Sequence, residues 1–174
     1  MKRILLVGCP GSGKSTVAKT LGSLLNIPVI HLDTEFWQPG WTLPEGADWV
    51  DRVEALIEED TWIMDGTYAR TFGVRIARAD TVLHFDFPRL LCLWRVLKRS
   101  LTAHGRTRSD MAPGCPERLN GRFLHYVWTF RERITPQIEA HLDLWADEKQ
   151  IVALRSPAQV HAFLDELHGK VGQH

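Results

Sequence analysis

Gly8-Cys9-Pro10-Gly11-Ser12-Gly13-Lys14-Ser15 stands between a short apolar run, Ile4–Val7, and a segment with helical periodicity. It reads G-x-x-x-x-G-K-S, the P-loop or Walker A pattern, whose meaning depends on this strand-to-helix context. Glycines reach positive φ at little cost, so successive N–H groups can turn inward around phosphate oxygens at the positive end of a helix. An ordinary glycine-rich turn is the alternative, but the complete motif in this context predicts a nucleoside triphosphate site.

The motif gives each of its side chains an expected role. Lys14 is expected to bridge the β- and γ-phosphates, and the Ser15 hydroxyl to coordinate Mg²⁺. The other nucleotide-binding residues predicted from the motif are Gly8, Pro10, Gly11, Ser12, Gly13 and Thr16. The predicted cofactors are therefore ATP and Mg²⁺.

Size and composition indicate one globular domain over residues 1–174, since 44% of the residues are hydrophobic. Lys plus Arg and Asp plus Glu number 21 each, and this zero net charge argues against broad nucleic-acid binding. The apolar run behind the N-terminus is too short for a signal peptide or a membrane span. Three well-separated cysteines fit a reducing compartment. We therefore expect a cytoplasmic protein with no membrane association.

Strand-like and helix-like segments alternate along the chain. Four more apolar segments are predicted strands: residues 29–32, 61–64, 81–86 and 150–154. Helices are predicted after the P-loop and at about 48–57, 88–101, 118–134, 136–145 and from Pro157, with fraying from Gly169. This alternation predicts a doubly wound α/β fold, a three-layer P-loop NTPase sandwich with a five-stranded parallel sheet. The buried stripe of the 88–101 helix is expected to be Leu90, Leu93, Trp94, Leu97 and Leu101.

Two aspartates follow predicted strands, at the edge where ligands collect in open α/β sheets. Asp65 ends an apolar strand about 50 residues after the P-loop, as a Walker B carboxylate does, and is expected to hold the Mg²⁺ shell with Ser15. Asp33 is placed to orient or deprotonate an acceptor hydroxyl, with a helix cap or turn as the alternative. Residues 34–47 cannot form a long helix and include Trp37, either a stacking surface for the acceptor or an anchor for the loop.

Several arginines are candidate phosphate ligands because the guanidinium fork matches phosphate oxygens. Arg70 and Arg75 are predicted to bind substrate phosphate, with a solvated surface position as the alternative for each. Arg95 and Arg99 are four residues apart on one helix, where two like charges indicate an anionic partner. The basic segment 103–122, called here the lid segment, contains glycine and proline and is expected to close over phosphates. Arg155 lies in a turn expected to border the adenine.

Asp65-Gly66 followed by Arg70 is similar to the Asp-Gly-Phe-Pro-Arg element of adenylate kinases, with one extra residue before the arginine. Arg95 and Arg99 lie where that superfamily has helix arginines that contact ATP. The chain also resembles a narrower adenylate-kinase-related group, labelled DNA topology modulation proteins, over most of its length. The segments that carry this resemblance are His31–Asp33, Trp37, Pro39–Trp41, Trp62–Tyr68, Arg75, Ala79-Asp80, Arg106–Asp110 and Gly114–Arg118.

The resemblance implies an adenylate or nucleoside kinase-like fold with a short lid, and ATP as phosphoryl donor. The lid segment lacks zinc cysteines and the region between the second and third strands is rich in tryptophan, so AMP does not follow as the acceptor. Some small-molecule kinases of this superfamily place an aspartate like Asp33 beside the acceptor hydroxyl. A DNA-related role follows from the group's label alone.

The leading hypothesis is a kinase that transfers the γ-phosphate of Mg-ATP to a nucleotide, a nucleoside or another hydroxyl metabolite. Its predicted catalytic residues are Lys14, Asp33, Arg95 and Arg99. The alternative is a nucleotide-dependent regulator that binds DNA or protein with ATP as a switch. A GTPase ranks third because the sequence has no Asn-Lys-x-Asp segment. The sequence leaves monomer and homodimer equally open.

Overall fold

Strand β1 (Arg3–Gly8) occupies the centre of a five-stranded sheet in the computed structural model, which describes residues 1–43 and 48–171. The other strands are β2 (Val29–His31), β3 (Trp62–Asp65), β4 (Thr81–Phe85) and β5 (Gln150–Leu154). They pair in the order β2-β3-β1-β4-β5, and every pair is parallel. The predicted parallel five-stranded sheet is confirmed, and β1, β3 and β4 are buried as central parallel strands should be.

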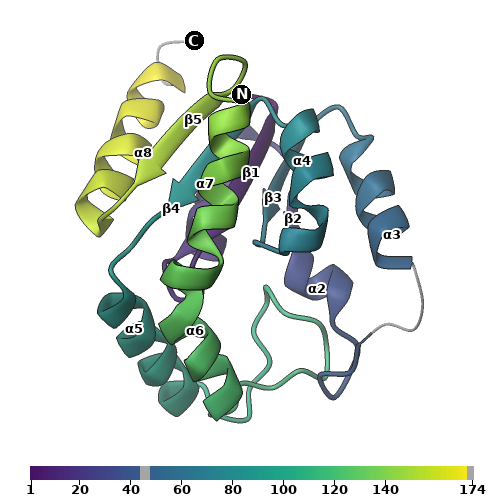
Figure 1. Ribbon diagram of the computed structural model, residues 1–174, viewed down its shortest axis with the longest axis vertical. Helices are drawn as coiled ribbons and strands as arrows, with labels where there is room; N and C mark the ends of the chain where they lie inside the picture. Colours follow the sequence, from purple (N-terminus) through teal and green to yellow (C-terminus); the bar gives the residue numbers. More distant parts are fainter. Residues whose placement is uncertain (44–47, 172–174) are drawn as a thin grey trace.

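Helices cover both faces of the sheet (Figure 1). Helices α4 (Phe72–Arg78) and α7 (Thr135–Leu144) lie in front of it in Figure 1, with α3 (Asp48–Ile57) beside α4. Helix α1 (Lys14–Leu25) packs on β3 and against α8 (Pro157–Val171) on the opposite face. In residues 1–43 and 48–171, none of the helices is long and apolar enough to cross a membrane.

The remaining elements gather beyond the carboxyl ends of the strands, at the lower end of Figure 1. They are α2 (Leu32–Phe36), the 3₁₀ turn η1 (Ala69–Thr71), α5 (Arg89–Thr102) and α6 (Gly121–Arg133). The lid segment connects α5 to α6 across this end, and its last two residues begin α6. Asn120 caps α6 by accepting hydrogen bonds from the N–H groups of Arg122 and Phe123.

The predicted buried stripe of α5 is wrong for three of its five residues, since Leu90, Trp94 and Leu101 are 67%, 56% and 72% exposed. Leu93 and Leu97 are half-buried, and Leu93 packs against the core. The fully buried residues of α5 are Cys92, Val96 and Ser100. Both sets recur with helical spacing, so periodicity alone could not decide which face is buried. The buried face is set by the P-loop, because Cys92 and Val96 lie against Gly11.

Some element boundaries also differ from the prediction. Helices α2 and α4 were not predicted, because five and seven residues are too few for a clear apolar period. Helix α8 continues to Val171, so fraying from Gly169 is wrong as far as the description extends. Residues 172–174 of that tail, and residues 44–47 of the predicted loop 34–47, lie outside the described residues.

Candidate active site

The P-loop joins β1 to α1 and wraps closely against α5. Gly11 has φ 84°, and a Cβ at this position would lie 2.5 Å from the carbonyl oxygen of Cys92, so only glycine fits there. The Lys14 ammonium group donates a hydrogen bond of 2.9 Å to the Cys9 carbonyl, which folds the side chain over the loop. The cradle that the motif predicts is therefore present, with a buried lysine at its centre.

A cavity of about 840 Å³ opens from the P-loop beneath the strand ends. It is lined by seven basic and four acidic side chains, an excess of three positive charges in a chain of zero net charge. The basic residues are Lys14, Lys19, Arg95, Arg99, Arg108, Arg118 and Arg122; the acidic residues are Asp33, Asp65, Asp110 and Glu117. The zero net charge of the whole chain therefore does not reflect the positive charge of this cavity, which suits an anion such as a triphosphate.

Four consecutive residues, the last of β3 and the three that follow it, line this cavity. The Asp65 carboxylate lies 3.1 Å from Nδ1 of His31. The Thr67 hydroxyl donates to the Gly8 carbonyl at 2.9 Å and accepts from the Gly8 N–H at 3.1 Å. The Tyr68 hydroxyl donates to the Asp33 carboxylate at 2.6 Å. This 65–68 turn therefore joins β2, the P-loop and the predicted acceptor base.

Asp33 combines burial with one strong hydrogen bond. Burial raises its pKa above the usual aspartate range, while the Tyr68 hydroxyl opposes that rise by stabilising the carboxylate. The negative charge of Asp65 raises the pKa further, and Arg108 and Lys14 lower it. A desolvated carboxylate with a raised pKa is a stronger proton acceptor than an exposed one, which suits a general base.

The structure corrects the two predicted substrate arginines. Arg75 is 0% exposed, and its guanidinium donates to backbone carbonyls of the 65–68 turn and of Thr71, so it does not reach the cavity. Arg70 lies on the surface in η1 and is absent from the cavity lining. The sequence showed arginines after a Walker B-like strand, but it could not show which side of the turn each one faces.

Arg95 and Arg99 line the cavity, and their predicted catalytic roles stay predictions. Arg95 donates to the Ser12 carbonyl at 3.2 Å, next to the P-loop. Nε of Arg99 lies 2.9 Å from a Glu117 carboxylate oxygen, and Nη1 of Arg108 lies 3.0 Å from the same oxygen. Burial and the Arg108 charge lower the pKa of Arg99, and Glu117 opposes this. Glu117 therefore holds Arg99 of α5 and Arg108 of the lid segment next to each other in the cavity wall.

The lid segment also packs on the loop after α2. Met111, Ala112 and Cys115 form a small apolar cluster with Trp37 and Trp41. The Trp41 indole donates to the Pro116 carbonyl at 3.1 Å, and the Lys19 ammonium donates to the Ser109 hydroxyl at 2.7 Å. Both tryptophans also line the cavity. Trp37 therefore anchors the loop and also lines the cavity, and its role as a stacking surface for the acceptor stays a prediction.

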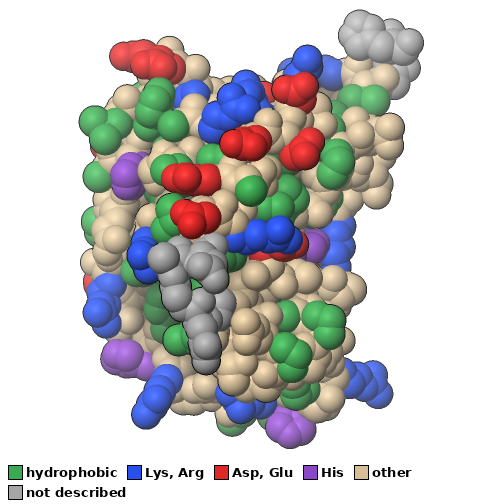
Figure 2. Space-filling model, turned by 90° about the vertical axis from the view of Figure 1, so that its right-hand side faces the viewer, with side chains coloured by type: hydrophobic (Ala, Val, Ile, Leu, Met, Phe, Trp, Pro, Cys, Tyr) green, Lys and Arg blue, Asp and Glu red, His purple; other side chains and the backbone are tan. Residues whose placement is uncertain are grey.

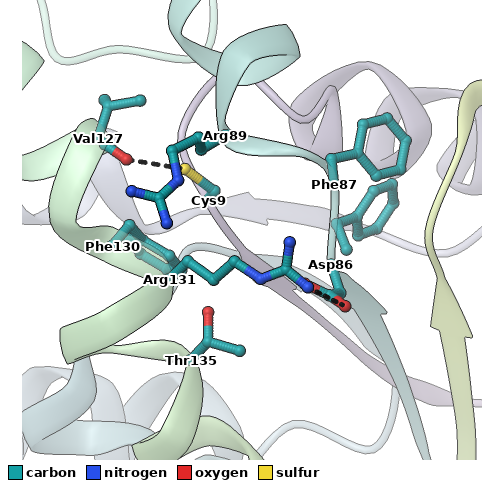
Figure 3. Close-up of a pocket in the computed structure, with 9 residues that line it drawn as sticks. Cys9, Asp86, Phe87, Arg89, Val127, Phe130, Arg131 and Thr135 are labelled. Atoms are coloured by element: carbon teal, nitrogen blue, oxygen red, sulfur yellow. Dashed lines mark hydrogen bonds and ion pairs between the residues drawn. The ribbon is translucent and has the colours of Figure 1, made fainter.

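Arg155 lies away from the cavity. Its Nε is 3.9 Å from Asp86, and its side chain is 70% exposed. Asp86 also pairs with Arg131 beside a pocket of about 10 Å³, room for about one water molecule (Figure 3). The adenine contact of Arg155 stays a prediction.

Cys9 lines this small pocket beside Asp86 and Arg131. A hydrogen bond with Cys92 and burial raise the pKa of Cys9, so it is a packed thiol and not a reactive one.

Ser15 and Asp65 fit the Mg²⁺ that accompanies a triphosphate, since both line the cavity. Within residues 1–43 and 48–171, no three acidic, histidine or cysteine side chains are grouped so that they could hold a metal on their own. Mg²⁺ in phosphoryl-transfer sites needs no such cage, because it keeps several waters and is bound by one or two protein oxygens with the substrate phosphates. A bound triphosphate would complete this partial set of ligands.

Sequence reasoning missed the residues that connect the predicted ones. Thr67, Tyr68, Arg108 and Glu117 were not predicted as site residues, although all four lie in segments that carry the family resemblance. The Tyr68–Asp33, Thr67–Gly8 and Arg108–Glu117 contacts join residues 35, 59 and 9 positions apart in the chain. One available signal was position, because Tyr68 follows β3 as Asp33 follows β2, and parallel strands end at one edge.

Comparison with known proteins identifies a sequence relative and several solved structures with a similar fold. No protein-family model matches the chain. In sequence it is 28% identical over 109 residues to the adenylate kinase of Clavibacter michiganensis subsp. michiganensis (strain NCPPB 382). The matched stretch is 61% of this chain and 53%, about half, of that protein.

Similar solved structures cover nearly the whole chain. They are shikimate kinase from Bacteroides thetaiotaomicron (TM-score 0.55, 16% identity, 98% of each chain) and deoxyadenosine kinase from M. mycoides (TM-score 0.54, 11% identity, 98% of this chain and 99% of the other). A gluconokinase from Sinorhizobium meliloti 1021 is also similar (TM-score 0.51, 15% identity, 99% and 92%). The chain is thus related in sequence to an adenylate kinase and has the α/β P-loop kinase fold. The narrower resemblance to DNA topology modulation proteins stays a prediction.

Proposed function

We propose that this protein is a kinase that transfers the γ-phosphoryl group of Mg-ATP to a hydroxyl group of a small acceptor. One observation carries the proposal: a single cavity holds the P-loop lysine at one end and the Asp33–Tyr68 pair at the other. The P-loop would bind the triphosphate, and the excess of basic side chains would offset its charge. Asp33 would lie on the acceptor side.

Each residue of the site has a role in the proposed transfer. Asp33 accepts the proton of the acceptor hydroxyl while that oxygen forms a bond to the γ-phosphorus. The bond from the γ-phosphorus to the bridging oxygen breaks, and ADP leaves with that oxygen. Lys14, Arg95 and Arg99 stabilise the charge that moves toward the bridging oxygen. Ser15 and Asp65 would hold Mg²⁺, which would supply positive charge to the phosphates when bound.

The acceptor is proposed only as a small hydroxyl compound. Similar proteins are named as kinases of shikimate, gluconate and deoxyadenosine, three chemically different compounds. The cavity walls offer aromatic rings of Trp37, Trp41 and Tyr68 beside the basic residues. A panel of acceptors should therefore contain nucleosides, nucleoside monophosphates, sugar acids and cyclic hydroxy acids.

A coupled ADP-release assay with Mg-ATP and this panel tests the proposal. We expect one acceptor class to raise ADP release above the acceptor-free rate, and the increase to vanish in Lys14→Ala. The proposal fails if Mg-ATP binds tightly and no acceptor raises the rate.

The DNA-binding form of a nucleotide-dependent regulator has less support. Figure 2 shows acidic side chains gathered on the face that includes α3. The exposed acidic residues in and just after this helix are Asp51, Glu54, Glu58, Glu59 and Asp60. Such a face repels phosphate backbones. A gel-shift titration at low and moderate salt, with and without ATP, should show no shift at micromolar protein; a shift dependent on ATP would favour the regulator.

A further inference from the structure

Arg75 has an unusual environment for an arginine. It is 0% exposed, and no carboxylate pairs with it in the described part of the chain. Its guanidinium instead donates to the backbone oxygens of Gly66 (2.7 Å), Thr67 (2.5 Å), Tyr68 (2.9 Å) and Thr71 (3.2 Å), and to the Thr71 hydroxyl (3.2 Å). Burial lowers the pKa of Arg75 to about 9, which leaves it charged at neutral pH. A charge is buried here at a cost, and its guanidinium contacts three consecutive carbonyls of one turn and Thr71 just beyond it, which calls for a reason.

The 65–68 turn that it holds is strained. Tyr68 has φ 29° and ψ 76°, outside the regions that non-glycine residues ordinarily adopt. Gly66 has φ 139°, and a Cβ there would lie 2.9 Å from Cβ of Leu32. Such strain costs of order 1–3 kcal/mol per residue and persists only where surrounding contacts enforce it. The carbonyls of Gly66, Thr67 and Tyr68 all point to one guanidinium, which supplies that enforcement.

The opposite side of the turn carries its side-chain contacts. Asp65 meets His31, Thr67 meets the P-loop at Gly8, and Tyr68 meets Asp33. Three consecutive carbonyls therefore face inward to Arg75 while three side chains face the cavity. Each side chain shares a backbone unit with one of these carbonyls or its neighbour. If the carbonyl contacts loosened, the backbone would shift and the side chains of Asp65, Thr67 and Tyr68 would move with it.

We propose that Arg75 is a positioning residue whose guanidinium braces the 65–68 turn and so delivers the Tyr68 hydroxyl to Asp33. It acts through Tyr68 and touches neither nucleotide nor acceptor. The importance of this for catalysis rests on the proposed function, because Asp33 is the acceptor base only if the protein is a kinase. The brace itself is a statement about geometry and can be tested without any substrate.

Lysine cannot replace this arginine although it keeps the charge. The guanidinium presents five donors in a rigid plane, whereas an ammonium group presents three from a point. Arg75→Lys therefore removes the fork geometry and preserves the positive charge. Arg78 supplies a matched control: it lies one turn away on α4 and donates to the carbonyls of Ile57 and Glu58, on the far side from the cavity.

The test is the ¹³C chemical shift of the Tyr68 ring carbon that bears the hydroxyl, in protein labelled with [ζ-¹³C]tyrosine. The chain has two tyrosines, so Tyr68→Phe assigns both signals. Asp33→Asn defines the shift of Tyr68 without its carboxylate partner. We expect Arg75→Lys to move the Tyr68 signal toward the Asp33→Asn position, and Arg78→Lys to leave it at the wild-type position.

A second variant guards against misfolding. Thr71→Val removes a hydroxyl that accepts from Arg75 Nε and donates to the Tyr68 carbonyl at 3.3 Å. Because it leaves the guanidinium and its three carbonyl contacts with the turn in place, it should move the Tyr68 signal in the same direction by less. The proposal is overturned if folded Arg75→Lys or Thr71→Val lowers the melting temperature and leaves the Tyr68 signal at the wild-type position. Because no nucleotide or acceptor is present, this result is independent of whether the kinase proposal stands.

Discussion

The floor and the lid of the cavity are held in place by different kinds of contact. The floor is the 65–68 turn with the P-loop, where buried hydrogen bonds to backbone atoms of Gly8, Gly66 and Thr67 fix the geometry. The lid segment is held toward the cavity by the ion pair of its Glu117 with Arg99 of α5, by hydrogen bonds from Trp41 and Lys19, and by one small apolar cluster. The bonds cited for the floor end on neutral backbone carbonyls, whereas the ion pair of the lid ends on a carboxylate, whose charge a phosphate also carries.

This difference determines which half a triphosphate can rearrange. A phosphate group does not compete for the backbone bonds of the floor, so the floor is already formed before binding. Phosphate can replace the Glu117 carboxylate on Arg99 and Arg108, because both anions match a guanidinium. In the described residues, Nε of each arginine also lacks a hydrogen bond of good geometry. The lid should therefore respond to nucleotide while the floor stays unchanged.

The largest effect should come from removing the floor's charge. Lys14→Ala deletes the ammonium group at the centre of the P-loop, and turnover should fall by about 10³-fold, as expected for the loss of one group that stabilises transferring charge. Circular dichroism should remain that of the wild type. Turnover at the wild-type rate in this variant would show that the P-loop is not the reaction site.

Asp33→Asn should have the next largest effect. Loss of a general base lowers kcat by about 10²-fold and leaves the affinity for Mg-ATP unchanged. Because burial raises the pKa of Asp33, the wild-type rate should fall as the pH drops through a value above the ordinary aspartate range. A pH–rate profile measures this, and an acid limb that survives in Asp33→Asn would assign it to another group.

Glu117→Gln tests the lid. Without the competing carboxylate, Arg99 loses its partner, and Arg108 keeps only its pair with Asp110 at 3.1 Å. Mg-ADP should therefore bind about fivefold more tightly, equivalent to ~1 kcal/mol for one ion pair. Isothermal titration calorimetry gives the affinity. Glu132→Gln breaks the Arg89–Glu132 pair outside the cavity and serves as the control. Equal or weaker binding in Glu117→Gln alone would mean that Glu117 orders the arginines for the ligand.

Asp80→Asn should change stability and leave both halves of the cavity unaffected. Burial opposes ionisation of Asp80, but hydrogen bonds from the Arg3 amide, the Thr81 hydroxyl and the Lys2 amide lower its pKa below the ordinary value. Its contribution is therefore present above the unfolded-state pKa of about 4 and is lost as the pH falls through the folded value. Urea unfolding should show a loss of about 1 kcal/mol near pH 7, which disappears near pH 2. An equal loss at both values would exclude a charge-dependent contribution.

The sequence predicted those parts of the molecule that follow local rules. The P-loop pattern, the five apolar strands and the aspartates at strand ends depend on neighbours in the chain, so the sheet and the placement of Lys14, Ser15, Asp33 and Asp65 around one cavity were accessible. Which face of α5 is buried was not accessible, because Cys92 packs on Gly11 across the fold.

Side-chain roles set by long-range contacts were also out of reach. Arg75 was expected at a substrate phosphate, and it braces the floor from behind. Glu117 lies in a segment that carries the family resemblance but was not predicted as a site residue, and it pairs with two arginines of the cavity. An arginine that binds phosphate and one that binds carbonyls look the same in sequence. The two are distinguished only by the fold, which decides whether the side chain points into the cavity or toward the backbone behind it.

The most direct test of the central claim is the fate of the γ-phosphorus. Protein incubated with [γ-³²P]ATP, Mg²⁺ and the acceptor panel should place the label in an organic phosphate, and Lys14→Ala and Asp33→Asn should lose this product. Label that stays in ATP or appears only as inorganic phosphate with every acceptor, despite tight binding of Mg-ATP, would contradict phosphoryl transfer to a small acceptor.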